Sequence, residues 1–254
     1  MTSLKETKKK SQSPISFIQN LLIAHWRSLF ILFIGVYLPL QIFELLVAKL
    51  WQYEAGFPWD LPILLTIHST AQPKLDVMAV AVTNLGLDMV IPILSIVAII
   101  LWQRKRWRSL AYLLTTTVGS IIINHTGKIL LHRLRPQIWL SLALEKSTFA
   151  FPSGHATMSM TLVCILLILI WATSWRWLIL AGGSLYVLVI AWTRLYLGVH
   201  FPSDILAGWM VAIAWSIGVS IIIKPNLTQP TVVGNQTQEE TFLLPEETQL
   251  VSKE

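Results

Sequence analysis

The sequence has few charged residues and a single cysteine. Of its 254 residues only 13% are Asp, Glu, Lys or Arg, whereas 54% are hydrophobic. Soluble domains carry about 25% charged residues, so this composition, with a mean hydropathy of +0.64, excludes an ordinary water-soluble globular protein. One cysteine cannot form an intramolecular disulfide, and Cys164 lies within an apolar run, where it is expected to be a small filler side chain. Most of the chain is therefore expected to lie in a bilayer.

The few charges are unevenly distributed along the chain. Residues 1–10 hold four lysines and one glutamate, and residues 225–254 hold five glutamates and one lysine. The whole chain carries +6, so removing the +3 of the first segment and the −4 of the last leaves +7 on residues 11–224. A bilayer disfavours ionised side chains, so these cations are expected to have a function. They do not form the exposed basic stripe of a nucleic-acid-binding domain, and no nucleic-acid partner is predicted.

Six apolar runs approach the length of about 20 residues that a helix needs to cross the hydrocarbon core. The runs are Leu29–Leu50, Asp88–Gln103, Ser109–Lys128, Ala156–Thr173, Trp177–Tyr196 and Ile205–Ile223. The second run is short, and its start is open between Val77 and Asp88 because Asn84 and Asp88 are polar. Tryptophans flank the runs, as they do at membrane interfaces. The predicted fold is an all-α bundle of six transmembrane helices.

These runs divide the chain into three parts. Residues 1–28 are predicted to form a basic N-terminal segment, and residues 29–223 a single membrane domain. Residues 224–254 are rich in Thr, Gln and Glu and are expected to form a disordered acidic tail. The first run is longer than the apolar part of a signal peptide and lacks a small-residue cleavage site, so it is predicted to be an uncleaved anchor.

The lysines and arginines on short connections set the expected orientation. One side of the membrane receives the N-terminal lysines together with Arg104, Lys105, Arg106, Arg108, Arg176 and Lys224. This side and both termini are therefore predicted to be cytoplasmic. The opposite side carries Lys74, Lys128, Arg133, Arg135, Lys146 and Arg194. Either the topology differs, or these outer cations bind something anionic.

The first of three motifs on the outer side runs from Lys128 to Arg135-Pro136. A helix that continued through it would place Lys128 and Arg135 on nearly the same face, because seven residues are close to two helical turns. Pro136 marks where the chain leaves the helix. Both cations are then expected to point at one site, although side chains that extend to lipid headgroups would produce the same pattern. His132 and Arg133, inside the same motif, are left out of the predicted site.

The second motif, Pro152-Ser153-Gly154-His155, precedes the fourth apolar run. Ser153 is predicted to be the N-cap of that helix, which leaves N–H groups of the first turn, including that of Gly154, able to bind an anion. A capped membrane helix needs no histidine at this position. His155 is therefore the specific feature of the motif.

The third motif runs from Thr193-Arg194 to Asp204 and joins the fifth and sixth runs. Gly198 allows the chain to turn back after Arg194. His200 and Asp204 are four residues apart, so in a compact turn the carboxylate accepts one ring N–H and leaves the other ring nitrogen to act as a nucleophile. A lone His/Asp pair is more often a structural hydrogen bond.

Together the three motifs resemble the signature of the type-2 phosphatidic acid phosphatase family, in its integral membrane branch. This family shares its phosphatase core with the vanadium haloperoxidases. The signature is a Lys, six residues and Arg-Pro; then Pro-Ser-Gly-His; then Ser-Arg, five residues, His, three residues and Asp. The chain departs from it only at Thr193, where the family usually has serine, and the resemblance covers about residues 60–220.

The resemblance implies a phosphatase site at the extracytoplasmic interface. It implies that His200 attacks phosphorus to form a phosphohistidine, that Asp204 orients His200, and that His155 protonates the leaving group. The implied phosphate-binding residues are Lys128, Arg135, Ser153, Gly154 and Arg194. Because fixed cations and N–H groups can stabilise the developing charge, no metal ion or other cofactor is predicted.

The expected function is hydrolysis of a phosphomonoester on a membrane lipid of the phosphatidic acid type, with the lipid substrate as the expected partner. A polyprenyl (undecaprenyl) diphosphate phosphatase is an alternative within the same chemistry. A non-catalytic lipid-binding or transport protein on the same fold is an alternative of another class. It would be expected to have lost His155, His200 or Asp204, and all three are present. The sequence does not set the oligomeric state.

Overall fold

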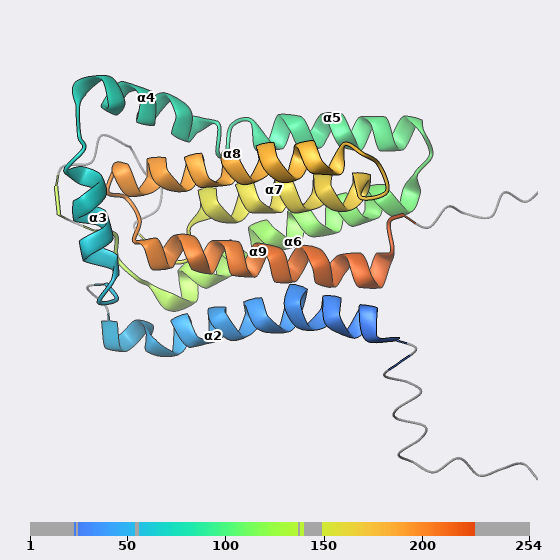
Figure 1. Ribbon diagram of the computed structural model, residues 1–254, viewed down its shortest axis with the longest axis horizontal. Coiled ribbons are helices and arrows are strands. Elements are labelled where there is room, and N and C mark those ends of the chain that lie inside the picture. Colours follow the sequence, from blue (N-terminus) through green and yellow to red (C-terminus); the bar gives the residue numbers. More distant parts are fainter. Residues whose placement is uncertain (1–22, 24, 54–55, 137, 140–148, 227–254) are drawn as a thin grey trace, which may run out of the picture.

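The long helices of the protein pack side by side as a bundle (Figure 1). The structure is a computed structural model that describes residues 23, 25–53, 56–136, 138–139 and 149–226. Apart from one isolated bridge between Leu134 and Phe149, these residues contain no β-structure, so the predicted all-α class is confirmed. Most of the basic N-terminal segment, most of the acidic tail and Lys146 lie outside the described residues.

The helices follow one another along the chain. A first helical segment, His25–Tyr53, comprises the π-helical turn η1 (Phe33–Tyr37), α2 (Leu38–Leu50) and the 3₁₀ turn η2 (Trp51–Tyr53). The remaining helices are α3 (Asp60–His68), α4 (Pro73–Asn84), α5 (Val90–Gln103), α6 (Trp107–Leu131), α7 (Gly154–Ile170), α8 (Arg176–Tyr196) and α9 (Pro202–Ile223). The last four predicted runs thus each correspond to one helix.

The second predicted run takes a different form from the other five. The chain from residue 73 to 103 forms two helices, α4 and α5, which lie one after the other along the same side of the bundle (Figure 1). Between them, Tyr186 of α8 donates its hydroxyl hydrogen bond to the carbonyl of Leu85 at 2.9 Å. Such a partner is needed in an apolar environment, because a broken helix leaves backbone groups unpaired. The open boundary in the sequence therefore corresponds to a helix break.

Among the residues that the structure describes, three helical segments are long and apolar enough to cross a membrane: His25–Tyr53, α8 and α9. The helices α5 and α7 are apolar but shorter, with 14 and 17 residues. The exterior of the bundle is rich in large apolar side chains, including Ile96, Leu185 and Ile222. In the interior, Thr161 donates a hydrogen bond to Ser120 across the α6–α7 contact. Apolar side chains on the exterior and hydrogen-bonded polar groups in the interior are typical of a bundle embedded in a membrane.

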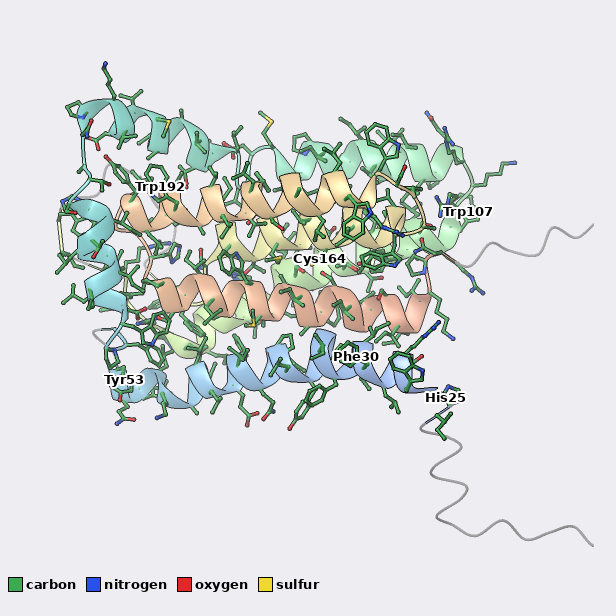
Figure 2. All side chains as sticks on the ribbon, viewed as in Figure 1. His25, Phe30, Tyr53, Trp107, Cys164 and Trp192 are labelled. Carbon is green, nitrogen blue, oxygen red and sulfur yellow. The ribbon has the colours of Figure 1, made fainter. Side chains whose placement is uncertain are left out.

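The two ends of the bundle carry different parts of the chain. The described chain ends and the α5–α6 and α7–α8 connections lie at one end (Figure 1). The C-terminus of α6, the N-terminus of α7, the α8–α9 turn and α3 lie at the other (Figure 1). Figure 2 shows His25 and Trp107 toward the first end, and Tyr53 and Trp192 toward the second. All three motifs are therefore at the end opposite the chain ends.

Close contacts at glycine bring the helices of the bundle together. α7 packs against α6, α8 and α9. A Cβ atom on Gly208 of α9 would lie 2.9 Å from the backbone oxygen of Ser153, and one on Gly119 of α6 would lie 2.3 Å from the indole of Trp215. These positions need the absence of a side chain, as is common where membrane helices approach closely.

Gly119→Ala is expected to destabilise the protein by about 1–3 kcal/mol, the usual cost of overpacking. The indole of Trp215 donates a hydrogen bond to the Thr116 carbonyl at 3.1 Å, so it cannot move away without losing that bond. The measurement is the midpoint of thermal unfolding in detergent. Gly182→Ala on α8 is the control, since nothing lies within 4 Å of a Cβ at that position. Equal midpoints for the two variants would contradict the α6–α9 packing.

Candidate active site

The turn between α8 and α9 carries His200. The chain reverses at Gly198, whose φ is +66°, a value that suits glycine. A Cβ atom there would also lie 2.6 Å from the ring of Trp139, so both the backbone and the packing require glycine. His200 follows two residues later and is only 1% exposed. Its imidazole is therefore fixed inside the end of the bundle.

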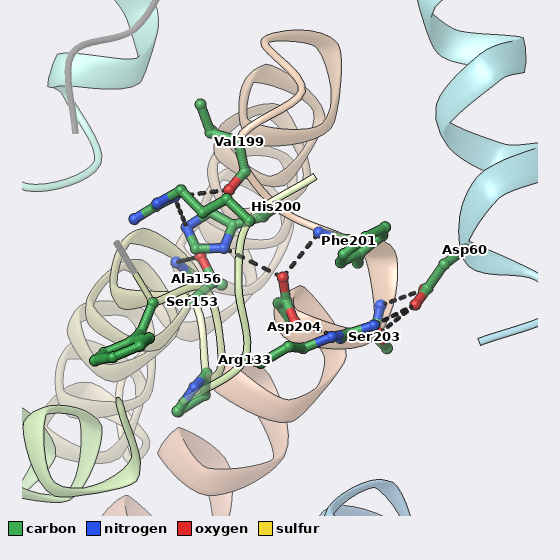
Figure 3. Close-up of polar contacts among 12 residues, drawn as sticks. Asp60, Arg133, Ser153, Ala156, Val199, His200, Phe201, Ser203 and Asp204 are labelled. Atoms are coloured by element: carbon green, nitrogen blue, oxygen red, sulfur yellow. Dashed lines mark hydrogen bonds and ion pairs between the residues drawn. The ribbon is translucent and has the colours of Figure 1, made fainter. Parts of the chain in front are cut away.

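The two ring nitrogens of His200 face different partners (Figure 3). Nδ1 lies 3.4 Å from Oδ2 of Asp204, which also accepts a hydrogen bond from the backbone N–H of Phe201 at 2.8 Å. Nε2 lies 3.2 Å from Nη1 of Arg135. A guanidinium only donates hydrogen bonds, so Nε2 is the acceptor and Nδ1 carries the proton that faces Asp204. The lone pair of Nε2 is thus directed toward the cations.

The environment of His200 keeps its ring neutral. Burial lowers the pKa of His200 well below its usual range, and the nearby charges of Arg135, Arg194, Lys128 and His155 lower it further. A neutral ring at neutral pH is the form that can act as a nucleophile. The same cations favour an anion placed next to Nε2.

Each of the three predicted cations is held by a neutral oxygen. The contacts are Lys128 Nζ to the Phe149 carbonyl (2.8 Å), Arg135 Nη1 to the Val199 carbonyl (2.7 Å) and Arg194 Nη1 to Thr83 Oγ1 (2.7 Å). Burial lowers the pKa of Arg135 to about 10, while the charge of Asp204 raises it. Arg135 therefore remains charged at neutral pH. None of these three oxygens cancels a positive charge.

The first motif is not a continuous helix, and that prediction is wrong. α6 ends at Leu131, and His132 adopts a left-handed conformation with φ +48°. Leu134 pairs with Phe149 in an isolated bridge. The helical conformation is disfavoured for the residue before Pro136, so the chain is extended here. Arg135 reaches the site from this extended segment rather than from the helical face of Lys128.

The extended segment also explains why Arg133 was missed. Side chains alternate in an extended chain, so Leu134 is 61% exposed whereas Arg133 is only 4% exposed. Nη1 of Arg133 donates a hydrogen bond to Asp204 Oδ1, and Nη2 donates one to Asp60 Oδ2 at 3.0 Å. In the sequence, the spacing of Arg133 and Arg135 before Pro136 was the feature that could have indicated an inward-facing Arg133. For Asp60, on the outer helix α3, the sequence offered none.

The second motif forms the start of α7 as expected. Ser153 is the N-cap, with its hydroxyl accepting a hydrogen bond from the Ala156 N–H at 3.5 Å. The backbone N–H of Ser153 donates to the carbonyl of Asp204 at 3.1 Å, which joins the start of α7 to the start of α9. Asn124 of α6 donates to the carbonyl of Pro152 at 3.1 Å. This contact, which the sequence analysis did not find, fixes the motif against α6.

The break between α4 and α5 borders the site. A Cβ atom on Gly86 would lie 2.9 Å from Cδ2 of His155, so the break packs directly on the half-buried second histidine. Thr83, at the end of α4, holds Arg194. The break therefore positions two of the predicted site residues, although it lies far from the motifs in sequence.

Two histidines outside the predicted set, His125 and His132, make none of the site contacts described above. His125 is exposed on α6, and His132 is exposed with its ring edge against Phe149 at a centroid distance of 4.7 Å. Within the described ranges, no group of three or more His, Cys, Asp or Glu side chains is arranged to hold a metal ion. The arrangement offers an oriented imidazole, a second histidine and three cations, which suits attack on a phosphate ester.

Comparisons with known proteins agree with this chemistry. The model of the PAP2 superfamily matches residues 109–227. Undecaprenyl-diphosphatase of Sulfolobus acidocaldarius is 26% identical over 195 residues, which cover 74% of this chain and 88% of that protein. Phosphatidylglycerophosphatase B of Bacillus subtilis is 29% identical over 153 residues, which cover 56% of this chain and 72% of that protein.

A solved structure shares the fold. The transmembrane PAP2-type phosphatidylglycerolphosphate phosphatase from Bacillus subtilis matches with a TM-score of 0.64 and 23% sequence identity, covering 76% of this chain and 98% of that one. Together with the three apolar helical segments, this fold makes the chain an integral membrane protein. The region matched by the family model begins near the start of α6, ends just past α9 and contains every residue of the three motifs. The chain therefore belongs to the PAP2 superfamily.

Proposed function

We propose that this protein is an integral membrane lipid phosphate phosphatase that hydrolyses a phosphomonoester of the phosphatidic acid type. The contact pattern of His200 carries the proposal, because Nδ1 faces Asp204 while Nε2 faces Arg135. A non-catalytic lipid-binding protein needs a cationic pocket but no oriented nucleophile. The relatives support a lipid phosphate as substrate, since two of them are named as a diphosphatase of undecaprenyl and a phosphatase of phosphatidylglycerophosphate.

In the first step, Nε2 of His200 attacks phosphorus opposite the ester oxygen. The N–P bond forms as the P–O bond breaks, and His155 transfers its proton to the leaving alkoxide. Asp204 stabilises the positive charge that the ring acquires in the phosphohistidine. In the second step, water attacks phosphorus, His155 accepts a proton from that water, and the N–P bond breaks. Inorganic phosphate leaves and Nε2 regains its lone pair.

The transferred phosphoryl group carries negative charge on its equatorial oxygens, and fixed donors stabilise it. We assign this role to Lys128, Arg135, Ser153, Gly154 and Arg194. The three cations lie near enough to His200 for their charges to act on it. Gly154 begins α7, where backbone N–H groups are available to an anion. No step needs a metal ion.

The proposed membrane arrangement has six spans within one domain, residues 29–223. The first segment and the helices α6, α7, α8 and α9 contribute five of them, and α5 with α4 contributes the sixth. The basic residues of the α5–α6 connection and Arg176 lie at the end of the bundle opposite the site. By the positive-inside rule, that end and both termini are cytoplasmic. The site is then extracytoplasmic, and a lipid reaches it from the outer leaflet.

Replacing the two histidines should separate their roles. His200→Ala is expected to lower kcat by at least about 10³-fold, the scale seen when a nucleophile is removed. His155→Ala should react with p-nitrophenyl phosphate, whose leaving group needs no proton, and accumulate a phosphoenzyme because the second step is slow. The measurement is acid-labile, alkali-stable radiolabel on the protein after reaction with ³²P-labelled p-nitrophenyl phosphate. His125→Ala, exposed on α6, is the control and should behave as wild type. Wild-type activity in a folded His200→Ala preparation would overturn the nucleophile assignment.

Phosphate release in the presence of excess EDTA tests the proposed chemistry and the substrate together. We expect full activity in EDTA, with phosphatidic acid turned over faster than phosphatidylglycerol phosphate or undecaprenyl diphosphate. Faster release from undecaprenyl diphosphate would favour the diphosphatase alternative. Loss of activity in EDTA that zinc or magnesium restores would contradict the metal-independent mechanism. No release from any of the lipids by folded protein would favour the lipid-binding alternative.

Cysteine labelling tests the orientation. In a Cys164→Ser background, Ser69→Cys lies on the exposed connection between α3 and α4, and Lys105→Cys lies on the exposed connection between α5 and α6. A membrane-impermeant maleimide added to intact cells should label the first variant and not the second. Permeabilised cells provide the control, because both variants should then react. The reverse pattern in intact cells would place the site in the cytoplasm.

A further inference from the structure

We infer that Asp60 and Arg133 are positioning residues for the nucleophile, which hold Asp204 and through it His200. The inference rests on the proposed function and deepens it. It also makes the outer helix α3 part of the reaction site, although that helix lies outside the three motifs. Neither residue touches the reacting atoms, so their effect must pass through Asp204.

The chain of contacts runs from α3 to the reactive ring (Figure 3). Asp60 Oδ2 accepts a hydrogen bond from Arg133 Nη2 at 3.0 Å, and Arg133 Nη1 donates to Asp204 Oδ1. The other carboxylate oxygen of Asp204 faces His200 Nδ1. Arg133 therefore occupies one oxygen of Asp204 and leaves the second aimed at the histidine. Without Arg133, Oδ1 would lose this ion pair, and the Phe201 N–H on Oδ2 would have to hold the carboxylate without it.

Asp60 also fixes the backbone on which Asp204 is carried. Its Oδ1 accepts a hydrogen bond from the backbone N–H of Ser203 at 2.9 Å, and its Oδ2 accepts one from the Ser203 hydroxyl at 2.6 Å. Ser203 lies in the first turn of α9, where N–H groups have no partner within the helix. Asp60 thus caps α9 from another helix. Ser203, the residue before Asp204, therefore contacts both members of the Asp60–Arg133 ion pair.

The pairing is buried on every side. Asp60 and Asp204 are fully buried, and the guanidinium of Arg133 lies over the ring of Phe201, 4.3 Å from its centroid. A buried ion pair is costly to desolvate and is weak evidence for stability. Each carboxylate that pairs with Arg133 is nevertheless held by a second contact, Asp60 by Ser203 and Asp204 by the Phe201 N–H. A positioning role accounts for the burial of these charges better than a stabilising role does.

The charges of the cluster match the proposed intermediate. Two carboxylates and one guanidinium leave one net negative charge beside His200. When His200 is neutral, no other group in the cluster of Asp60, Arg133, Asp204 and His200 balances that negative charge. When Nε2 bonds to phosphorus the ring becomes a cation, and the cluster of Asp60, Arg133, Asp204 and His200 becomes neutral. The cluster therefore favours the phosphorylated state over the starting state, which is where a catalyst needs stabilisation.

Asp60→Asn is the central test, because it keeps the shape and removes the charge. We expect kcat for phosphatidic acid to fall by about 10–100-fold, as when an outer partner that orients a reacting group is lost. KM should stay within about twofold, since the polar contacts of Asp60 go to Phe57, Arg133 and Ser203 and not to a phosphate-binding residue. A purely structural role would lower thermal stability and the amount of active protein while leaving kcat per active site unchanged.

Asp76→Asn is the matched control. Asp76 is on the neighbouring outer helix α4 and accepts a hydrogen bond from the Tyr196 hydroxyl of α8 at 2.6 Å. It too is an aspartate that joins an outer helix to the bundle, but it has no contact with Arg133 or Asp204 among those described. Its kcat should equal the wild-type value. Equal losses in both variants would point to general loosening of the outer helices and overturn the inference.

A double-mutant cycle with Asp204→Asn tests whether Asp60 acts through Asp204. If it does, adding Asp60→Asn to Asp204→Asn should lower kcat by less than about twofold, because the path is already broken. Losses that multiply would show that the two residues act independently and would overturn the inference. If Asp60→Asn does not fold, Ser203→Ala replaces it, since the Ser203 hydroxyl contacts both Asp60 and Arg133. A wild-type kcat for folded Ser203→Ala would then be the contradicting result.

Failure of the inference and failure of the proposed function give different results. If wild-type protein is active and His200→Ala is inactive, but Asp60→Asn has wild-type kcat, only the positioning role is wrong. If folded wild-type protein releases no phosphate from any lipid, the proposed function is wrong and the inference falls with it.

Discussion

Arg133 lies between Asp60 and Asp204 with its guanidinium shielded from solvent, and an ion in that position costs several kcal/mol unless its partners are fixed. At the end of the bundle that carries the site, several parts of the chain hold the partners of Arg133 in place. The extended segment before Pro136 turns Arg133 inward, α3 supplies one carboxylate, and the first turn of α9 supplies the other. The same extended segment brings Arg135 to His200. The ion pair and the reactive histidine therefore depend on one local arrangement of the chain.

In the rest of the bundle, backbone groups and polar side chains in an apolar surrounding must also find hydrogen-bond partners. Inside, hydroxyl groups such as those of Thr161 and Ser120 bond across helices. The helix break after α4 meets the requirement by using Tyr186 for one freed carbonyl. It also places Gly86 against His155 and Thr83 on Arg194. An irregular stretch of backbone is thus found where it supports polar groups, as expected for a protein that keeps most of its surface apolar.

Local signals in the sequence predicted local structure well. The apolar runs located the long helices, Ser153 was identified as an N-cap, and the spacing of His200 and Asp204 anticipated their contact. The error at Lys128 and Arg135 arose because a helical period was applied where Pro136 makes the chain extended. Arg133 was noticed but not assigned, since its partner Asp60 lies 73 residues away. Such a pairing depends on how α3 packs on the bundle, which no periodicity in a single sequence reports.

The region matched by the family model starts at residue 109, yet α3, α4 and the α4–α5 connection contribute Asp60, Thr83 and Gly86 to the surroundings of the site. The motif residues and the residues that hold them therefore lie in two stretches of the chain, and the family model matches only the second. The motif stretch defines which bond is broken. The preceding stretch, residues 60–86, contains no motif residue, yet it contacts Arg133, Arg194 and His155. Under the positioning role inferred for Asp60, a change in this stretch would leave every motif residue in place and still act on the reaction, because Asp60 holds the arginine that fixes Asp204.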